Sequence, residues 1–215
     1  MGHNLDALFN PENIAVIGAS NNPLKAGYTV IYNLNQIGYP KKVFPVTMSA
    51  DEILGRKCYK KLSQIEDTVE LVVLGTPAKM IYDIMDDLET RMEERQDVKV
   101  IVCIAADYGE TKTEEGIKRQ ECLIQTAKRY GIRVVGPNCI GIIDNINRGH
   151  HICGDAYSKR NERAEGRNQF YLPERSDGGF YPDDGGFRPG ADLHEQIHLH
   201  RKYGGCGLYR PAGVL

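Results

Sequence analysis

Short apolar runs alternate with amphipathic segments along residues 5–147. Five of the runs have the continuous apolar character of strands that are buried on both faces of a sheet, at 13–20, 42–47, 70–77, 98–106 and 132–138. Because strands and helices alternate along the chain, the strands are expected to be parallel and joined by right-handed crossovers. The pattern predicts one α/β domain, a Rossmann-like doubly wound parallel sheet built from five βα units.

Two of the intervening segments place apolar residues on one helical stripe and carry end signals. Residues 25–38 stop at Gly38, which suits the left-handed position after a helix. Residues 76–92 start with Thr76 as the predicted N-cap and Pro77 at the first helical position. The stripes consist of Val30, Ile31, Leu34 and Ile37 in the first segment and of Ile81, Ile84, Met85, Leu88 and Met92 in the second.

A third helical segment runs from residue 111 to residue 131. Thr111 and Glu114 stand at the spacing of a capping box, in which each side chain bonds the other residue's backbone amide. Gly131 provides the end signal. This segment is therefore expected to connect the last two strands.

The loops that follow the five strands are the expected ligand site, because ligands of such sheets bind at the carboxyl ends of the strands, where the strand order reverses. These loops cover residues 18–27, 46–50, 75–78, 104–110 and 136–141. Each holds glycine, proline or small residues, so the backbone can approach a ligand closely, and amides at helix starts favour phosphate. The first loop, GASNNPLKAG, is not a G-x-G-x-x-G loop, and the second strand ends in FPVTMS without an acidic residue for a ribose. An NAD-dependent oxidoreductase domain therefore remains only as an alternative.

The composition excludes several classes of protein. The chain of 215 residues has a formal net charge of −2, which argues against a nucleic-acid partner. Its N-terminus lacks the apolar region of a signal peptide, and no apolar run is long enough to cross a bilayer. The six cysteines are scattered, which favours reduced thiols in a cytoplasmic protein over a disulfide or zinc framework. Cys103 and Cys139 lie in strand-end loops, but the domain holds no histidine beyond His3 to act as a base, so we interpret both as small buried residues and assign no catalytic residue.

Four motifs in one order and spacing resemble the N-terminal CoA-binding domain of the NDP-forming acyl-CoA synthetases, which are relatives of the succinyl-CoA synthetase α-subunit. The motifs are LDALFNPENIAVIGASNNPLKAGYTVIYNL, ADEILGRKCYKKLSQI, LVVLGTPA and RVVGPNCIGIID. The resemblance covers residues 5–147 and implies a Rossmann-like CoA-binding domain with its CoA site across the strand ends.

The resemblance also implies which residues contact CoA. The nucleotide end would be held by Gly18, Ala19, Ser20, Lys25 and Gly27, with Lys25 as the cation for the phosphates. The adenosine side would be lined by Val46 and Thr47, the pantetheine path by Thr76, Pro77, Ala78, Ile104 and Ala105, and the thioester region by Asn138. Structural roles alone would also explain three of these residues: Lys25 as a solvated helix start, Pro77 as a helix start and Asn138 as a turn residue.

This sequence departs from the family pattern at two places. The family has Asn-Pro after the second strand, where this chain has Thr47-Met48. The family has Gly-Phe after the fourth strand, where this chain has Asp107-Tyr108. The first change concerns the adenosine contacts, and the second adds a carboxylate near the substrate end.

Residues 148–215 differ in character from the preceding domain. They hold five of the six histidines, many glycines and arginines, few aliphatic residues and no sustained periodicity. HHIC and HEQIHLH suggest a metal site, but we favour another explanation and assign no metal. Read one nucleotide later, the codons permit T-T-F near residue 150, S-F-I-C-Q-S-G-A after residue 168 and Y-I-S-I-G-N after residue 195. These resemble successive elements of the family's second domain, so we predict a frameshifted, disordered tail from near Arg148.

The resemblance implies a reaction for the full-length family, in which acyl-CoA, NDP and phosphate give acid, CoA and NTP through a phosphohistidine. CoA or acyl-CoA would be the ligand of this domain, and an ATP-grasp domain or subunit would be its partner. Because the histidine machinery is not readable in this chain, we expect the chain alone to be inactive. The alternative is a stand-alone CoA- or nucleotide-binding regulatory module, and exposed strand edges leave self-association as a homo-oligomer open.

Overall fold

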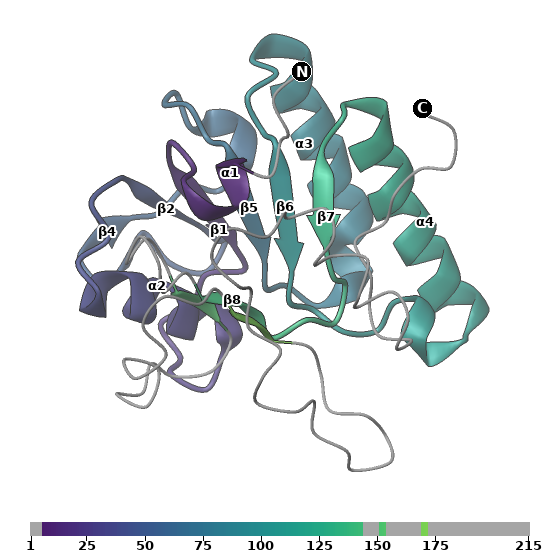
Figure 1. Ribbon diagram of the computed structural model, residues 1–215, viewed down its shortest axis with the longest axis horizontal. Coiled ribbons are helices and arrows are strands. Elements are labelled where there is room, and N and C mark those ends of the chain that lie inside the picture. Colours follow the sequence, from purple (N-terminus) through teal and green to yellow (C-terminus); the bar gives the residue numbers. More distant parts are fainter. Residues whose placement is uncertain (1–5, 144–150, 154–168, 172–215) are drawn as a thin grey trace, which may run out of the picture.

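The computed structural model describes residues 6–143, 151–153 and 169–171. Its centre is a parallel sheet in the order β2-β1-β5-β6-β7 (Figure 1). The strands are β1 (Ile14–Ile17), β2 (Val43–Val46), β5 (Leu71–Leu74), β6 (Val100–Cys103) and β7 (Arg133–Val135). Each lies within one of the predicted apolar runs, so the predicted parallel sheet is confirmed. The order reverses at β1, which pairs with β2 on one side and with β5 on the other.

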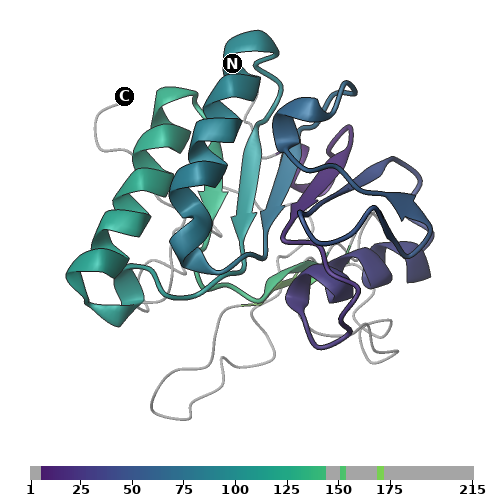
Figure 2. The same cartoon turned by 180° about the vertical axis from the view of Figure 1, so that it is seen from behind.

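Helices cover both faces of this sheet, as seen in Figures 1 and 2. One face packs against α1 (Asp6–Phe9) and α2 (Ala26–Gln36), and the other packs against α3 (Ile81–Glu94) and α4 (Glu114–Arg129). Neighbouring strand residues alternate between the two cores: Ile14 and Val16 lie on the α2 side, and Ala15 and Ile17 lie on the α3 side. Burial on both sides explains why the strands are continuously apolar rather than alternating.

The connection from β2 to β5 is not an α-helix, which corrects the expectation of five βα units. It consists of a hairpin, β3 (Glu52–Ile53) and β4 (Arg56–Lys57), followed by the 3₁₀ turn η1 (Leu62–Gln64). The hairpin loop is Leu54-Gly55, with φ angles of +49° and +78°. Two central residues with positive φ favour a tight hairpin turn, so the chain reverses here instead of starting a helix.

Two predicted helix starts are also wrong. α3 begins at Ile81 after the 3₁₀ turn η2 (Ala78–Met80), and the Met80 amide donates to the Pro77 carbonyl at 3.0 Å. Pro77, with ψ at 135°, therefore precedes a 3₁₀ turn, and Thr76 does not cap α3.

In α4 the N-cap is Thr113 rather than Thr111. The Thr113 hydroxyl accepts the Gly116 amide at 3.1 Å. Thr111 belongs to the 3₁₀ turn η3 (Gly109–Thr111), and its hydroxyl donates to the Tyr108 carbonyl at 2.8 Å. The predicted end signals hold, because Gly38 and Gly131 have φ angles of +63° and +68° just after α2 and α4.

A small antiparallel sheet follows β7, in the order β10-β8-β9. Its strands are β8 (Gly141–Ile143), β9 (His151–Cys153) and β10 (Gln169–Tyr171), and β9 lies against α2. These last two strands are the described part of residues 148–215. The predictions of disorder and of a frameshifted origin concern residues that otherwise lie outside the described ranges.

Candidate functional site

The loop after β1 packs its backbone closely against two neighbouring segments at the reversal of strand order. Gly18 has a φ of +87°, and a Cβ on it would lie 2.7 Å from the Thr76 backbone nitrogen. A Cβ on Gly27 would lie 2.1 Å from the Gly18 carbonyl oxygen. Any side chain at either position would push the neighbouring backbone away. The two glycines therefore determine how closely the start of α2 approaches the ends of β1 and β5.

The loop after β2 is joined to the loop after β1 by backbone hydrogen bonds. The amides of Gly18 and Ala19 donate to the Val46 carbonyl at 3.0 and 3.3 Å. On the other side, the Thr47 amide donates to the Tyr59 carbonyl at 2.8 Å. The Val46 side chain is buried, so its link to the first loop is made by its backbone rather than its side chain.

The start of α2 presents backbone amides beside this junction. The amides of Tyr28 and Thr29 donate to the Lys25 carbonyl at 2.9 and 3.1 Å. The preceding amides of Ala26 and Gly27 have no acceptor among the described residues. The Lys25 side chain is exposed and caps no backbone group of the helix. Free amides, the positive end of the helix dipole and an exposed lysine together suit an anionic ligand.

The loops after β5, β6 and β7 form a second contiguous group. The amides of Ile104 and Ala105 donate to the Leu74 carbonyl at 3.0 and 3.3 Å, and the Asn138 amide donates to the Ala105 carbonyl at 3.0 Å. Asn138 has a φ of +54°, a left-handed conformation that asparagine tolerates better than most residues. The resulting chain of contacts runs from β2 to β7 along one edge of the sheet.

The predicted contact residues all lie along this edge, although their side chains differ in access. Thr76 is half-buried with its methyl group against Gly18, whereas Pro77 is exposed and Ala78 is buried. Ser20 is half-buried, and its hydroxyl accepts the Asn22 amide at 3.0 Å. Their contacts with a ligand remain a prediction.

The loop after β6 contains Asp107-Tyr108, where the family pattern has Gly-Phe. Asp107 has a φ of +73° and an exposed side chain. The Glu110 carboxylate accepts the amides of Asp107 and Tyr108 at 2.7 and 3.1 Å, which holds the loop in this conformation. Burial raises the pKa of the Tyr108 phenol, so this side chain stays neutral. Asp107 thus adds an exposed carboxylate to this loop, and this carboxylate forms no ion pair with another described residue.

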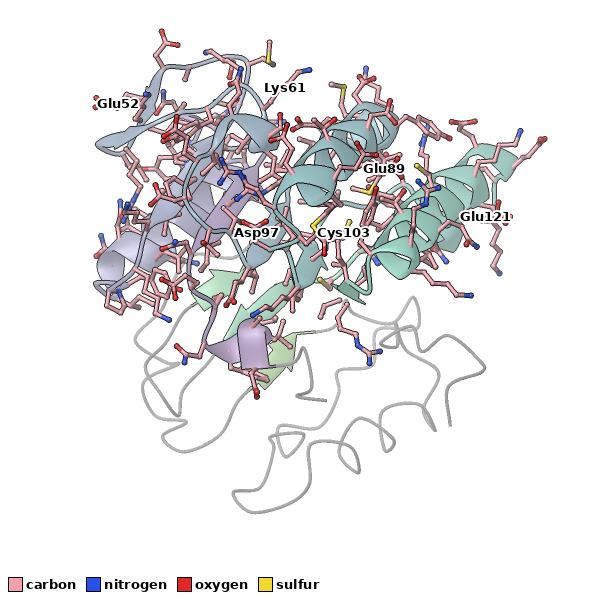
Figure 3. All side chains as sticks on the ribbon, turned by 90° about the horizontal axis from the view of Figure 1, so that it is seen from above. Glu52, Lys61, Glu89, Asp97, Cys103 and Glu121 are labelled. Atoms are coloured by element: carbon pink, nitrogen blue, oxygen red, sulfur yellow. The ribbon has the colours of Figure 1, made fainter. Side chains whose placement is uncertain are left out.

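The cysteines near the strand ends are buried, as the sequence predicts. Cys103 ends β6 (Figure 3), and the Cys139 thiol donates to the Cys103 carbonyl at 3.2 Å. Cys58, Cys103, Cys122 and Cys139 are free thiols. Burial raises the pKa of Cys58 and Cys122. Within the described ranges, no group of three or more acidic, histidine or cysteine side chains could hold a metal. No described helix is long and apolar enough to cross a membrane.

Gly75 lies in the loop 75–78 that the sequence predicts for the site, whereas sequence reasoning assigned no role to Leu24, Met48 or Arg91. Gly75 borders the site, since a Cβ on it would lie 3.5 Å from the Gly27 nitrogen. Leu24 and Met48 are exposed in the loops after β1 and β2. The sequence signal that could have drawn attention to them is a large apolar residue inside a polar loop. Arg91 is fully buried, and its position three residues after Leu88 on the apolar stripe of α3 would have indicated this.

Comparisons with known proteins agree on the domain. The family model described as a CoA binding domain matches residues 12–145. Acetate–CoA ligase (ADP-forming) I subunit alpha of Pyrococcus furiosus is 40% identical over 143 residues, which are 65% of this chain and 30% of that protein. Acetate–CoA ligase (ADP-forming) II of Archaeoglobus fulgidus is 34% identical over 140 residues, covering 65% of this chain and 20% of that protein. The chain thus spans less than a third of the length of these relatives.

A solved structure shares the architecture. The dinucleotide forming acetyl-coenzyme A synthetase 1 of Ca. Korarchaeum cryptofilum, in complex with phosphate and ADP, matches with a TM-score of 0.62 and 34% identity. The match covers 72% of this chain and 32% of that chain.

Proposed function

This chain belongs to the family of CoA-binding domains, and from this premise we propose that it binds CoA across the carboxyl ends of β1, β2, β5, β6 and β7. The observation that carries the proposal is the close approach of Gly27 to Gly18 and of Gly18 to Thr76. It brings the free amides of α2 to the reversal of strand order, where ligands of doubly wound sheets bind.

The chemistry of the two halves of this edge matches the two halves of CoA. The phosphates are anionic and fit the amides of Ala26 and Gly27 with Lys25 beside them. The pantetheine arm is uncharged and fits the small residues of the second group, from Thr76 past Ala105 to Asn138. The thiol end would then lie near the loop that carries Asp107.

The names of the relatives favour ADP as the nucleotide of the complete reaction. We propose that this domain supplies the CoA site of an ADP-forming acyl-CoA synthetase, and that the phosphohistidine and the ATP-grasp domain or subunit lie in other domains or chains. The domain alone would bind CoA or acyl-CoA without turning it over.

We also propose that residues 148–215 are a frameshifted translation of a second domain. Support comes from the three family-like stretches that one alternative frame permits in the expected order. Sequencing the coding DNA across codons 140–215 tests this. An open alternative frame that reads S-F-I-C-Q-S-G-A is expected. Stop codons in that frame would refute the frameshift and would make the histidines of this segment candidates for a site again.

Calorimetric titration of the full chain with CoA tests the proposed function. CoA is expected to bind with one site per chain, and NADH is expected to produce no heat because the end of β2 has no acidic residue for a ribose. Binding of NADH but not CoA would support the oxidoreductase alternative. No heat and no thermal shift with CoA at millimolar concentration would refute the proposal.

A further inference from the structure

The loop after β6 presents a carboxylate from a backbone conformation that few side chains adopt. Asp107 has a φ of +73°, in the left-handed region that glycine occupies most readily. Its side chain is exposed, and its carboxylate forms no ion pair with another described residue. Neither burial nor ion pairing therefore accounts for an acidic side chain at a position where glycine would be free of strain. Residues held in such conformations are concentrated at functional sites.

Hydrogen bonds hold both backbone groups of Asp107. Its amide donates to the Glu110 carboxylate at 2.7 Å, and its carbonyl accepts from the Arg119 guanidinium at 3.3 Å. The next residue is held as well, because Tyr108 is buried and its carbonyl accepts the Thr111 hydroxyl at 2.8 Å. The backbone that carries the carboxylate is thus ordered before a ligand arrives, which lowers the entropic cost of an interaction with that ligand.

The same loop is joined to the strand ends on both sides of it. The Ala105 amide donates to the Leu74 carbonyl at 3.3 Å, at the end of β5, and the Ala105 carbonyl accepts the Asn138 amide at 3.0 Å, in the loop after β7. Asp107 follows Ala105 by two residues. It therefore lies beside the part of the edge where we place the thiol end of CoA.

The charges around Asp107 leave its own charge uncompensated. Residues 107–119 hold four acidic and three basic side chains, which leaves one negative charge in excess. Two of the basic side chains are paired with other acids: Lys118 with Glu114 at 2.6 Å, and Arg119 with Glu115 at 3.5 Å. A ligand that reaches this loop consequently meets a net negative charge.

We propose that Asp107 determines which acyl groups this site accepts, by excluding acyl groups that end in a carboxylate. This inference rests on the proposed function. A thioester carries its acyl group on the CoA sulfur, so the acyl group lies at the thiol end of the site, beside the loop that holds Asp107. A second carboxylate there is repelled by the first, whereas an uncharged acyl group meets no such cost. The substrate class of the site is therefore uncharged acyl-CoA.

Calorimetry with two acyl-CoA ligands of equal chain length tests the proposal. Butyryl-CoA and succinyl-CoA both carry a four-carbon acyl group, which ends in a methyl group in the first and in a carboxylate in the second. The full-length wild type is expected to bind succinyl-CoA about 5- to 10-fold more weakly than butyryl-CoA at low salt. This ratio should fall at high salt, because ions screen exposed charges.

Two variants remove the charge without disturbing the loop. Asp107→Asn keeps the size of the side chain and tolerates a positive φ, and Asp107→Gly suits that φ best. Both are expected to bring the two affinities within about twofold of each other and to leave the affinity for CoA itself unchanged. Glu121→Gln removes an exposed carboxylate from α4 (labelled in Figure 3) and should keep the wild-type ratio.

The outcomes separate this inference from the proposed function. If the wild type binds CoA but binds both acyl-CoA ligands equally, the inference is overturned while the proposed function stands. The same holds if Asp107→Asn keeps the wild-type ratio, because another group then excludes the anion. If the wild type does not bind CoA, the proposed function has failed, and this inference fails with it.

Discussion

At the scale of single residues, the site depends on the absence of a side chain at Gly27. The Gly18 carbonyl occupies the space that a Cβ would need, at 2.1 Å. Since backbone cannot yield as a flexible side chain can, a larger residue must displace the start of α2. The same displacement would move the amides that we assign to the phosphates of CoA.

Gly27→Ala is therefore expected to lower stability by about 1–3 kcal/mol and CoA affinity by at least ~10-fold. Urea unfolding and calorimetry measure the two effects. Gly38→Ala is the matched control, because its φ of +63° strains alanine while nothing lies near its Cβ. It should lower stability and leave CoA affinity unchanged. If the two variants bound CoA with equal affinity, the proposal that Gly27 shapes the CoA site would be contradicted.

Lys25 is the exposed cation of the site, and its charge should matter more than its packing. Lys25→Gln is expected to weaken CoA binding about 5- to 10-fold at low salt and less at high salt, because salt screens an exposed charge. Lys128→Gln, an exposed lysine at the end of α4, is the control. A salt-independent loss, or an equal loss in the control, would argue against a phosphate contact by Lys25.

At the scale of elements, Arg91 joins α3 to the β2–β5 connection. It donates to the carbonyls of Leu62, Ile65 and Asp67 at 3.0, 2.7 and 2.7 Å, and it pairs with Asp97 at 2.6 Å. The arginine thus satisfies carbonyl groups within residues 62–67, which have no regular secondary structure apart from η1.

Arg91→Met is expected to destabilise the domain by about 3–5 kcal/mol, because it leaves the Asp97 charge and three carbonyls without their partner. Chemical denaturation measures this. Arg95→Met removes an exposed arginine that donates to the Glu66 carbonyl, and it should cost less than about 1 kcal/mol. Similar losses in the two variants would mean that burial of Arg91 contributes little.

The N-cap of α4 can be tested in the same way. Thr113→Ala is expected to cost about 1 kcal/mol, because the Gly116 amide loses its acceptor. Thr90→Ala within α3 is the control, since its hydroxyl only donates to the carbonyl of Asp86 in the preceding turn. A loss no larger at Thr113 than at Thr90 would contradict the assigned cap.

The elements that sequence reasoning predicted well are those whose signal is repeated over many residues. The five strands and the apolar stripes of α2 and α3 follow directly from burial on one or two faces. Helix starts, in contrast, depend on single hydrogen bonds. Thr111 and Thr113 are both threonines just before α4, so either hydroxyl could cap the helix as far as the sequence shows. Thr111 belongs to the 3₁₀ turn η3, where its hydroxyl donates to the Tyr108 carbonyl, so Thr113 is the cap. Sequence spacing does not reveal this turn.

The site was predictable to a similar degree. The loops and their glycines followed from strand ends and family motifs, but the contact of Gly27 with Gly18 depends on the packing of α2 across β1. Arg91 was missed because a charged side chain is ordinarily placed at the surface, even where its spacing from Leu88 puts it on the apolar stripe of α3. Its partners come from a connection whose path only the fold defines.

At the scale of the whole molecule, the core residues that the structure describes as buried lie within the first two thirds of the chain. They run from Ala7 to Ile142. A hydrogen bond also links α3 to α4: the Glu89 carboxylate (labelled in Figure 3) accepts from the Arg129 guanidinium at 2.6 Å. A fragment that ends at residue 147 is therefore expected to unfold cooperatively and to bind CoA within about twofold of the full chain. An unfolded fragment would show that residues 148–215 contribute to the domain.

Hydrogen–deuterium exchange of the full chain with and without saturating CoA tests the central claim most directly. CoA is expected to slow amide exchange in residues 18–29, 46–50 and 75–78, with a smaller effect in 104–110 and 136–141. Exchange on the outer turns of α3 and α4 should not change. Protection confined to those helices, or no protection at any of the strand-end loops, would contradict a CoA site at the carboxyl edge of the sheet.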